Sequence, residues 1–128
     1  MVINRDIETR EDIELFIRHF YETVKTDPLI GIIFTEVVKM DWDHHIPVIV
    51  DFWETILLDR SVYKKNAMAV HYDLNKKYPL QQKHFDAWLL AFNSVLDGLF
   101  QGPISDLAKK RAAGIGALMV YKMTNASL

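Results

Sequence analysis

Tyr21, His45, His71 and Trp88 are the residues of this 128-residue chain whose side chains could together perform chemistry. The imidazole of His71 can ligate a metal ion, and the other three can donate hydrogen bonds to a buried ligand. Tyr21, His45 and Trp88 each lie on an apolar helical stripe, where a polar ring is costly unless it has a partner. The set is therefore compatible with a metal-bound ligand surrounded by hydrogen-bond donors.

Each of these residues also has a simpler interpretation when it is taken alone. A histidine in a loop, such as His71, is usually just exposed. Tyr21 could be an interfacial tyrosine, and Trp88 an ordinary core residue whose N–H meets a carbonyl. His45 lies near the start of a predicted helix and could cap it or lie at its rim. Only the order of these residues along the chain favours a shared role.

The elements that must position them are helices. Thr9 opens the first, with Asp12 in a capping-box position, and the apolar stripe that contains Tyr21 ends before Pro28. Residues 28–34 are apolar but interrupted by Pro and Gly, which predicts a short helical turn. Asp41 or Asp43 can cap a second helix, whose stripe runs from His45 to Leu57.

The second half of the chain contains a less regular segment and then two more helices. Periodicity fades over residues 59–79, which include His71, so we expect loop with short helical turns there. Pro79 is expected to start a third long helix that carries Trp88 and ends before Gly102-Pro103. A last helix follows from Ile104. No strand signal is convincing, so the fold class is all-α.

Composition limits the class of protein further. Half of the residues are hydrophobic and 12% are aromatic, which suits a core that encloses a flat apolar group. The net charge of −2 gives no excess of positive charge that would favour binding to nucleic acid or to an anionic membrane. Cysteine is absent, which excludes thiolate metal sites. We expect a single domain over residues 1–128, with no signal peptide or transmembrane segment and a cytoplasmic location.

Short motifs distributed along most of the chain carry a resemblance to a known family. They are Phe20-Tyr21-Glu22-Thr23-Val24, Gly31-Ile32-Ile33-Phe34, Trp42-Asp43-His44-His45 followed by Phe52-Trp53, His71-Tyr72-Asp73-Leu74, and His84-Phe85-Asp86-Ala87-Trp88-Leu89. In this order and at close to this spacing, they resemble the third group of the truncated haemoglobins. Paired-glycine motifs, which other truncated groups often use, are absent here.

The resemblance implies a two-over-two helical sandwich around haem b. It makes His71 the proximal ligand of the iron and places Tyr21, His45 and Trp88 in the distal pocket. Ile49 lies one turn after His45 and should touch the distal face of the haem. The complete set of expected haem contacts is Phe34, His45, Ile49, Phe52, Trp53, Met68, His71, Tyr78, Phe85 and Trp88. Of the other histidines, His19 and His84 are expected to lie at the surface, and His44 is expected to face away from the haem.

The expected ligands are O₂, NO and CO. A pocket rich in donors should release O₂ slowly, which favours NO dioxygenation or peroxide reduction over oxygen transport, with an electron-donating reductase as partner. Two alternatives stay open. The chain could be a haem-based gas sensor or haem-handling protein that acts through a partner, or a haem-free helical interaction module.

Overall fold

The computed structural model describes residues 5–37, 41–59, 74–75 and 79–126, and these form helices and no strand. The long helices are α1 (Arg10–Lys25), α2 (Trp42–Leu57), α4 (Gln82–Leu99) and α5 (Pro103–Ala126). A short π-helix, η1 (Ile33–Val37), lies between α1 and α2. The all-α fold class that the sequence predicts is confirmed.

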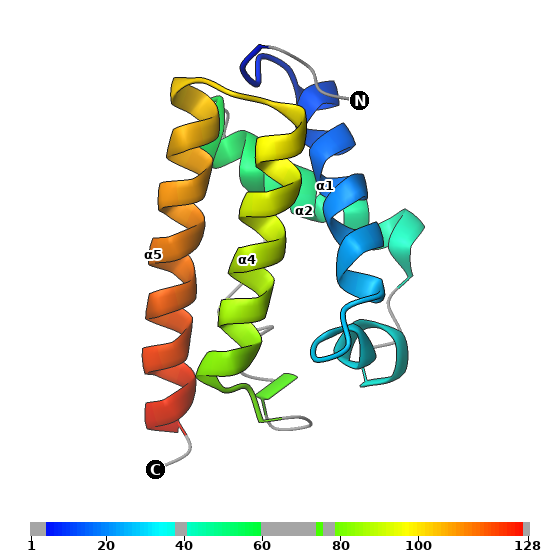
Figure 1. Ribbon diagram of the computed structural model, residues 1–128, viewed down its shortest axis with the longest axis vertical. Helices are drawn as coiled ribbons and strands as arrows, with labels where there is room; N and C mark the ends of the chain where they lie inside the picture. The colour runs from blue at the N-terminus through cyan, green and yellow to red at the C-terminus, as the bar shows by residue number, and fades with distance from the viewer. Residues whose placement is uncertain (1–4, 38–40, 60–73, 76–78, 127–128) are drawn as a thin grey trace.

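The helices form two packed pairs (Figure 1). Helices α4 and α5 run side by side in opposite directions, and α1 packs against both α2 and α4. Helix α2 crosses behind α4 in this view. This is the two-over-two arrangement that the family resemblance implies. None of the described helices offers an apolar stretch long enough to cross a membrane.

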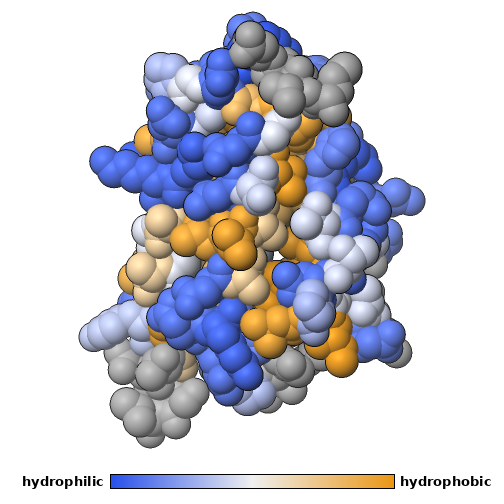
Figure 2. All heavy atoms as spheres, in the orientation of Figure 1, coloured by the Kyte–Doolittle hydropathy of each residue, from blue (hydrophilic) through white to orange (hydrophobic). Residues whose placement is uncertain are grey.

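Aromatic side chains fill the centre where α1, α2 and α4 meet. Phe92 of α4 lies 4.9 Å from Phe16, 5.5 Å from Phe20 and 5.0 Å from Trp53, measured between ring centroids. Phe16, Phe20 and Phe92 are almost wholly buried, so each removes a large apolar area from water. On the face of the molecule that Figure 2 shows, hydrophilic side chains border an apolar band over the middle of the helices.

The first helix begins as its sequence predicts. The hydroxyl of Thr9 accepts a hydrogen bond from the Asp12 N–H, and the Asp12 carboxylate accepts one from the Thr9 N–H. After α1 the chain turns at Gly31, where a Cβ atom would lie 2.5 Å from the carbonyl oxygen of Lys25. Only glycine allows so close an approach, and it places η1 and Phe34 directly beside the end of α1.

Asp6 fixes the N-terminal segment to the start of α5. Its carboxylate accepts hydrogen bonds from the backbone N–H groups of Ile104 and Ser105 at 2.7 and 2.9 Å. Gly102, just before the helix, has a φ of 143° and lies too close to Asp6 for any side chain. Asp6 thus satisfies the free N–H groups that a helix start leaves without partners.

Two expectations about the third long helix are wrong. Helix α4 begins at Gln82 and not at Pro79, because Gln81 is its N-cap and His84 completes a capping box. His84 is buried and not at the surface, and its Nδ1 accepts a hydrogen bond from the Gln81 N–H at 2.9 Å. Burial lowers the pKa of His84, and neighbouring Lys83 lowers it further, so the neutral ring needed for this contact is favoured.

Candidate functional site

Tyr21 lies at the meeting point of three elements. It faces inward from α1 and is only 9% exposed. Its ring centroid lies 5.6 Å from that of Phe34 in η1 and 5.1 Å from that of Trp42 at the start of α2. The phenol is therefore held by aromatic rings and cannot easily change its direction.

Trp88 of α4 completes this arrangement. Its indole N–H donates a hydrogen bond to the Tyr21 hydroxyl, and its ring stacks on Phe92 at 5.3 Å. Burial raises the pKa of Tyr21 well above its usual value, against the opposing effect of the Trp88 hydrogen bond. The phenol therefore keeps its proton at neutral and alkaline pH. The structure brings together two of the three side chains expected in the distal pocket.

His45 lies in the first turns of α2 and is half-buried. Its ring contacts that of His44 at 5.6 Å. Within the described part of the chain, it makes no ring contact or hydrogen bond with Tyr21 or Trp88. His19 is exposed, as the sequence predicts, and so is His44. His45 thus lies one turn after Trp42, which packs against Tyr21. His45 itself is not among the described rings that contact Tyr21.

Most of the expected cofactor contacts that the structure describes lie at the margin of the core and not inside it. Phe34, Ile49, Phe52, Phe85 and Trp88 are apolar side chains that pack against the core and stay partly exposed. Such a margin, next to the buried Tyr21 side chain, suits a flat apolar group. Trp53 differs, because it is buried among the core rings beside Phe92.

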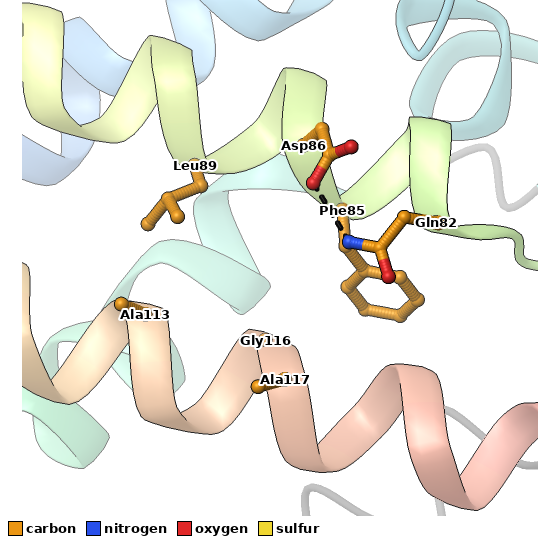
Figure 3. Close-up of a pocket in the computed structure, with 7 residues that line it drawn as sticks. All are labelled: Gln82, Phe85, Asp86, Leu89, Ala113, Gly116 and Ala117. Carbon is orange, nitrogen blue, oxygen red and sulfur yellow. Dashed lines mark hydrogen bonds between the residues drawn. The ribbon is translucent and has the colours of Figure 1, made fainter.

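Phe85 faces a shallow hollow between α4 and α5 (Figure 3). The hollow has a volume of about 200 Å³, and Gly116 and Ala117 form its α5 wall. At its rim, Gln82 donates a hydrogen bond to Asp86 at 2.7 Å. The hollow shares no lining residue with the surroundings of Tyr21.

Three expected contacts, Met68, His71 and Tyr78, lie outside the described residues. Among the residues that are described, no group of three or more His, Asp or Glu side chains could hold a metal ion. A haem iron, in contrast to a bare ion, is held by its porphyrin and needs a single axial protein ligand in globins and peroxidases. The donor chemistry of Tyr21 and Trp88 fits the ligand side of such a group.

Trp42 and Lys25 take part in this site although the sequence reasoning assigned them no role. The Lys25 Nζ atom lies 4.5 Å from the centroid of the Trp42 ring and 3.0 Å from a Glu22 carboxylate oxygen. Trp42 belongs to one of the quoted motifs, and a tryptophan in the first turn of a helix is a signal that could have been used. The contact with Lys25 joins α1 to α2 across a loop and could not have been foreseen.

Comparisons with known proteins agree with this arrangement. The chain is 29% identical over 119 residues to a group 3 truncated hemoglobin of Campylobacter jejuni, which covers 88% of this chain and 91% of that protein. The crystal structure of a group III truncated hemoglobin from Campylobacter jejuni superposes with a TM-score of 0.83 at 25% identity, covering 94% and 95% of the two chains. No family model matches. The resemblance and the truncated-globin fold that the motifs predict are confirmed.

Proposed function

We propose that this chain, whose sequence and fold resemble those of group III truncated haemoglobins, binds haem b through His71 and holds a diatomic gas beside Tyr21. The observation that carries the proposal is the hydrogen-bonded pair of Tyr21 and Trp88 inside an otherwise apolar aromatic cluster. Tyr21 is the buried member of this pair, and burying its phenol is costly unless the hydroxyl proton finds an acceptor. When bound, haem supplies an iron with one open position for O₂, NO or CO.

The direction of the hydrogen bond decides what Tyr21 can do. The Trp88 N–H donates to the Tyr21 oxygen, so the phenol keeps its own proton for another acceptor. Hydrogen-bonded phenols of this kind become better donors, because the bonds in a chain polarise one another. Tyr21 would therefore donate directly to a gas that gains negative charge on binding, and Trp88 would strengthen and orient that donation.

Such a site suits chemistry on the bound gas better than transport. A hydrogen bond from Tyr21 to a charged acceptor is worth about 1.5–3 kcal/mol, which slows release of O₂ by roughly ten- to a hundredfold. We infer NO dioxygenation, in which NO and O₂ combine to nitrate and a reductase returns one electron for each turnover. Peroxide reduction is the second candidate, since it needs the same donors and an electron supply.

The decisive experiment for haem binding is the visible absorption spectrum of the protein. Purified protein reconstituted with haem should show a Soret band, and His71→Ala should lose it or shift it strongly. His44→Ala is the matched control, because His44 is an exposed histidine and its removal should leave the band unchanged. A wild-type protein with no Soret band would refute the haem proposal and favour the haem-free interaction module.

The reaction itself needs a separate test. Mixing the O₂ complex with NO in a stopped-flow instrument should consume both and yield nitrate in equal amount. A gas sensor or a haem-handling protein would share the pocket yet show no turnover when a reductase is supplied. Fast O₂ dissociation together with no nitrate would contradict detoxification chemistry.

A further inference from the structure

A groove in the surface leads directly to Tyr21. It has a volume of about 280 Å³ and lies where α1 meets the first turns of α2. It is lined by Arg18, Tyr21, Glu22, Lys25, Trp42 and Ile46. Tyr21 thus belongs both to the groove wall and to the hydrogen-bonded pair with Trp88.

Trp42 fills the space between the groove and the interior. It is half-buried, with its ring 5.1 Å from that of Tyr21 and 6.2 Å from that of Phe34. The ring is therefore partly exposed in the groove and also packs against Tyr21, beside which the gas is proposed to bind. If the ring moved away, the groove would open to the edge of Tyr21 and Phe34.

Lys25 holds this ring from outside. Its Nζ lies 4.5 Å from the Trp42 ring centroid, within the range of a cation–π interaction. The same ammonium group pairs with Glu22 at 3.0 Å, and the Lys25 side chain is only 28% exposed. The pairing with Glu22 fixes the position of the charge, so Lys25 favours the closed position of Trp42.

We propose that Trp42 is a plug in a second route to the distal pocket, and that Lys25 sets how often it opens. Small neutral gases would reach Tyr21 through this groove. The first route would pass His45, one turn later in α2, whose ring could swing aside to admit a gas. This inference rests on the proposed function, since it needs a gas site beside Tyr21. It concerns access to the ligand. Because Trp42 also packs against the Tyr21 ring, the Lys25 variants, which keep the Trp42 side chain, separate access from the hydrogen bond of Tyr21.

The test is the kinetics of CO binding to the haem-loaded protein after flash photolysis. CO is neutral, so charge on the groove rim does not steer it. Trp42→Ala should speed CO association and CO dissociation by the same factor and leave the affinity unchanged, because a plug alters a barrier and not an equilibrium. Lys25→Met, which removes the charge and keeps the chain length, should speed both rates by roughly two- to fivefold.

Two control variants separate a plug from a structural effect. Lys25→Arg preserves the cation over the ring and should bind CO as the wild type does. Arg18→Met removes another positive charge from the same groove without touching Trp42 and should also change nothing. Unchanged rates in Lys25→Met or Trp42→Ala would overturn the plug, even with the Soret band intact. So would a change in dissociation alone. A missing Soret band would refute the proposed function as well.

Discussion

At the scale of single residues, the site depends on how two aromatic side chains share one hydrogen bond. Trp88 has a single N–H, and it is directed to the Tyr21 hydroxyl. The two residues therefore act as a unit and not as independent donors. This distinction has a consequence that kinetics can measure.

We expect Tyr21→Phe to speed O₂ dissociation by roughly ten- to a hundredfold, because one hydrogen bond to a charged acceptor is lost. Trp88→Phe should have a smaller effect, and it should have almost none once Tyr21 is already Phe. The measurement is a double-mutant cycle on O₂ dissociation rates. Additive effects of the two substitutions would show that Trp88 acts on the ligand by itself.

Asp12 provides a residue-scale prediction about pH. The Arg5 guanidinium, which donates to both Asp12 oxygens at 2.7 Å, lowers the pKa of this carboxyl to about 2. An unfolded chain would protonate Asp12 near pH 4. The ionised carboxylate thus stabilises the fold above about pH 4, and this contribution is lost as the pH falls towards 2.

Asp12→Asn should lower the free energy of unfolding by about 1 kcal/mol at pH 7, and the difference from wild type should shrink as the pH falls to 2. Urea unfolding at several pH values measures this. Glu8→Gln is the control, because Glu8 faces the same Arg5 at 3.9 Å but is largely exposed. A difference that stays constant with pH would contradict the assignment.

At the scale of elements, the start of α5 depends on a residue far away in the sequence. Hydrogen bonds from Ile104, Ser105 and Ile7 lower the pKa of Asp6, although desolvation acts in the opposite direction. Gly102, at the position before the helix, has no side chain to cap it. The carboxylate of Asp6 therefore takes the role that a local Ser or Asp usually has.

Asp6→Ala should cost about 2–3 kcal/mol in the free energy of unfolding, because several donors lose a partly buried charged acceptor. Hydrogen exchange at the amides of Ile104 and Ser105 should become faster. Asp106→Asn is the matched control, since Asp106 is an exposed acidic residue in the first turn of the same helix. Similar losses in the two variants would show that Asp6 has no special role.

The same scale shows which elements the sequence could predict. The capping box of Thr9 and Asp12 is local, so α1 begins where its residues indicate. Helix α4 begins three residues after Pro79, because Gln81 and His84 form a capping box at its start. Gln and His are not the residues usually preferred in such a box, so the sequence does not indicate this start. His84 is buried because of the same capping box. The contacts of Asp6 with α5, and of Lys25 with Trp42, join distant segments and leave no local pattern.

At the scale of the whole molecule, the residues expected around the cofactor belong to different parts of the chain. Phe34, Ile49 and Phe85 lie at the margin of one core, yet they come from η1, α2 and α4. These residues could be predicted from the sequence because the motifs that contain them follow the order of the family. The family fold then tells which of them come close together in space. His71, the residue on which the prediction rested most, remains a prediction.

A cofactor that contacts several helices should stabilise the whole fold and not one element. Haem that binds only the folded chain adds RT ln(1 + [L]/Kd), or about 4 kcal/mol at a thousand times Kd. We therefore expect thermal unfolding of the haem-loaded protein at a clearly higher Tm than the haem-free protein. His71→Ala should remove most of this gain. Asp6→Ala should lower both Tm values alike, because the Asp6 cap and the cofactor site share no partner. A gain that survives in His71→Ala would place the main haem contacts elsewhere.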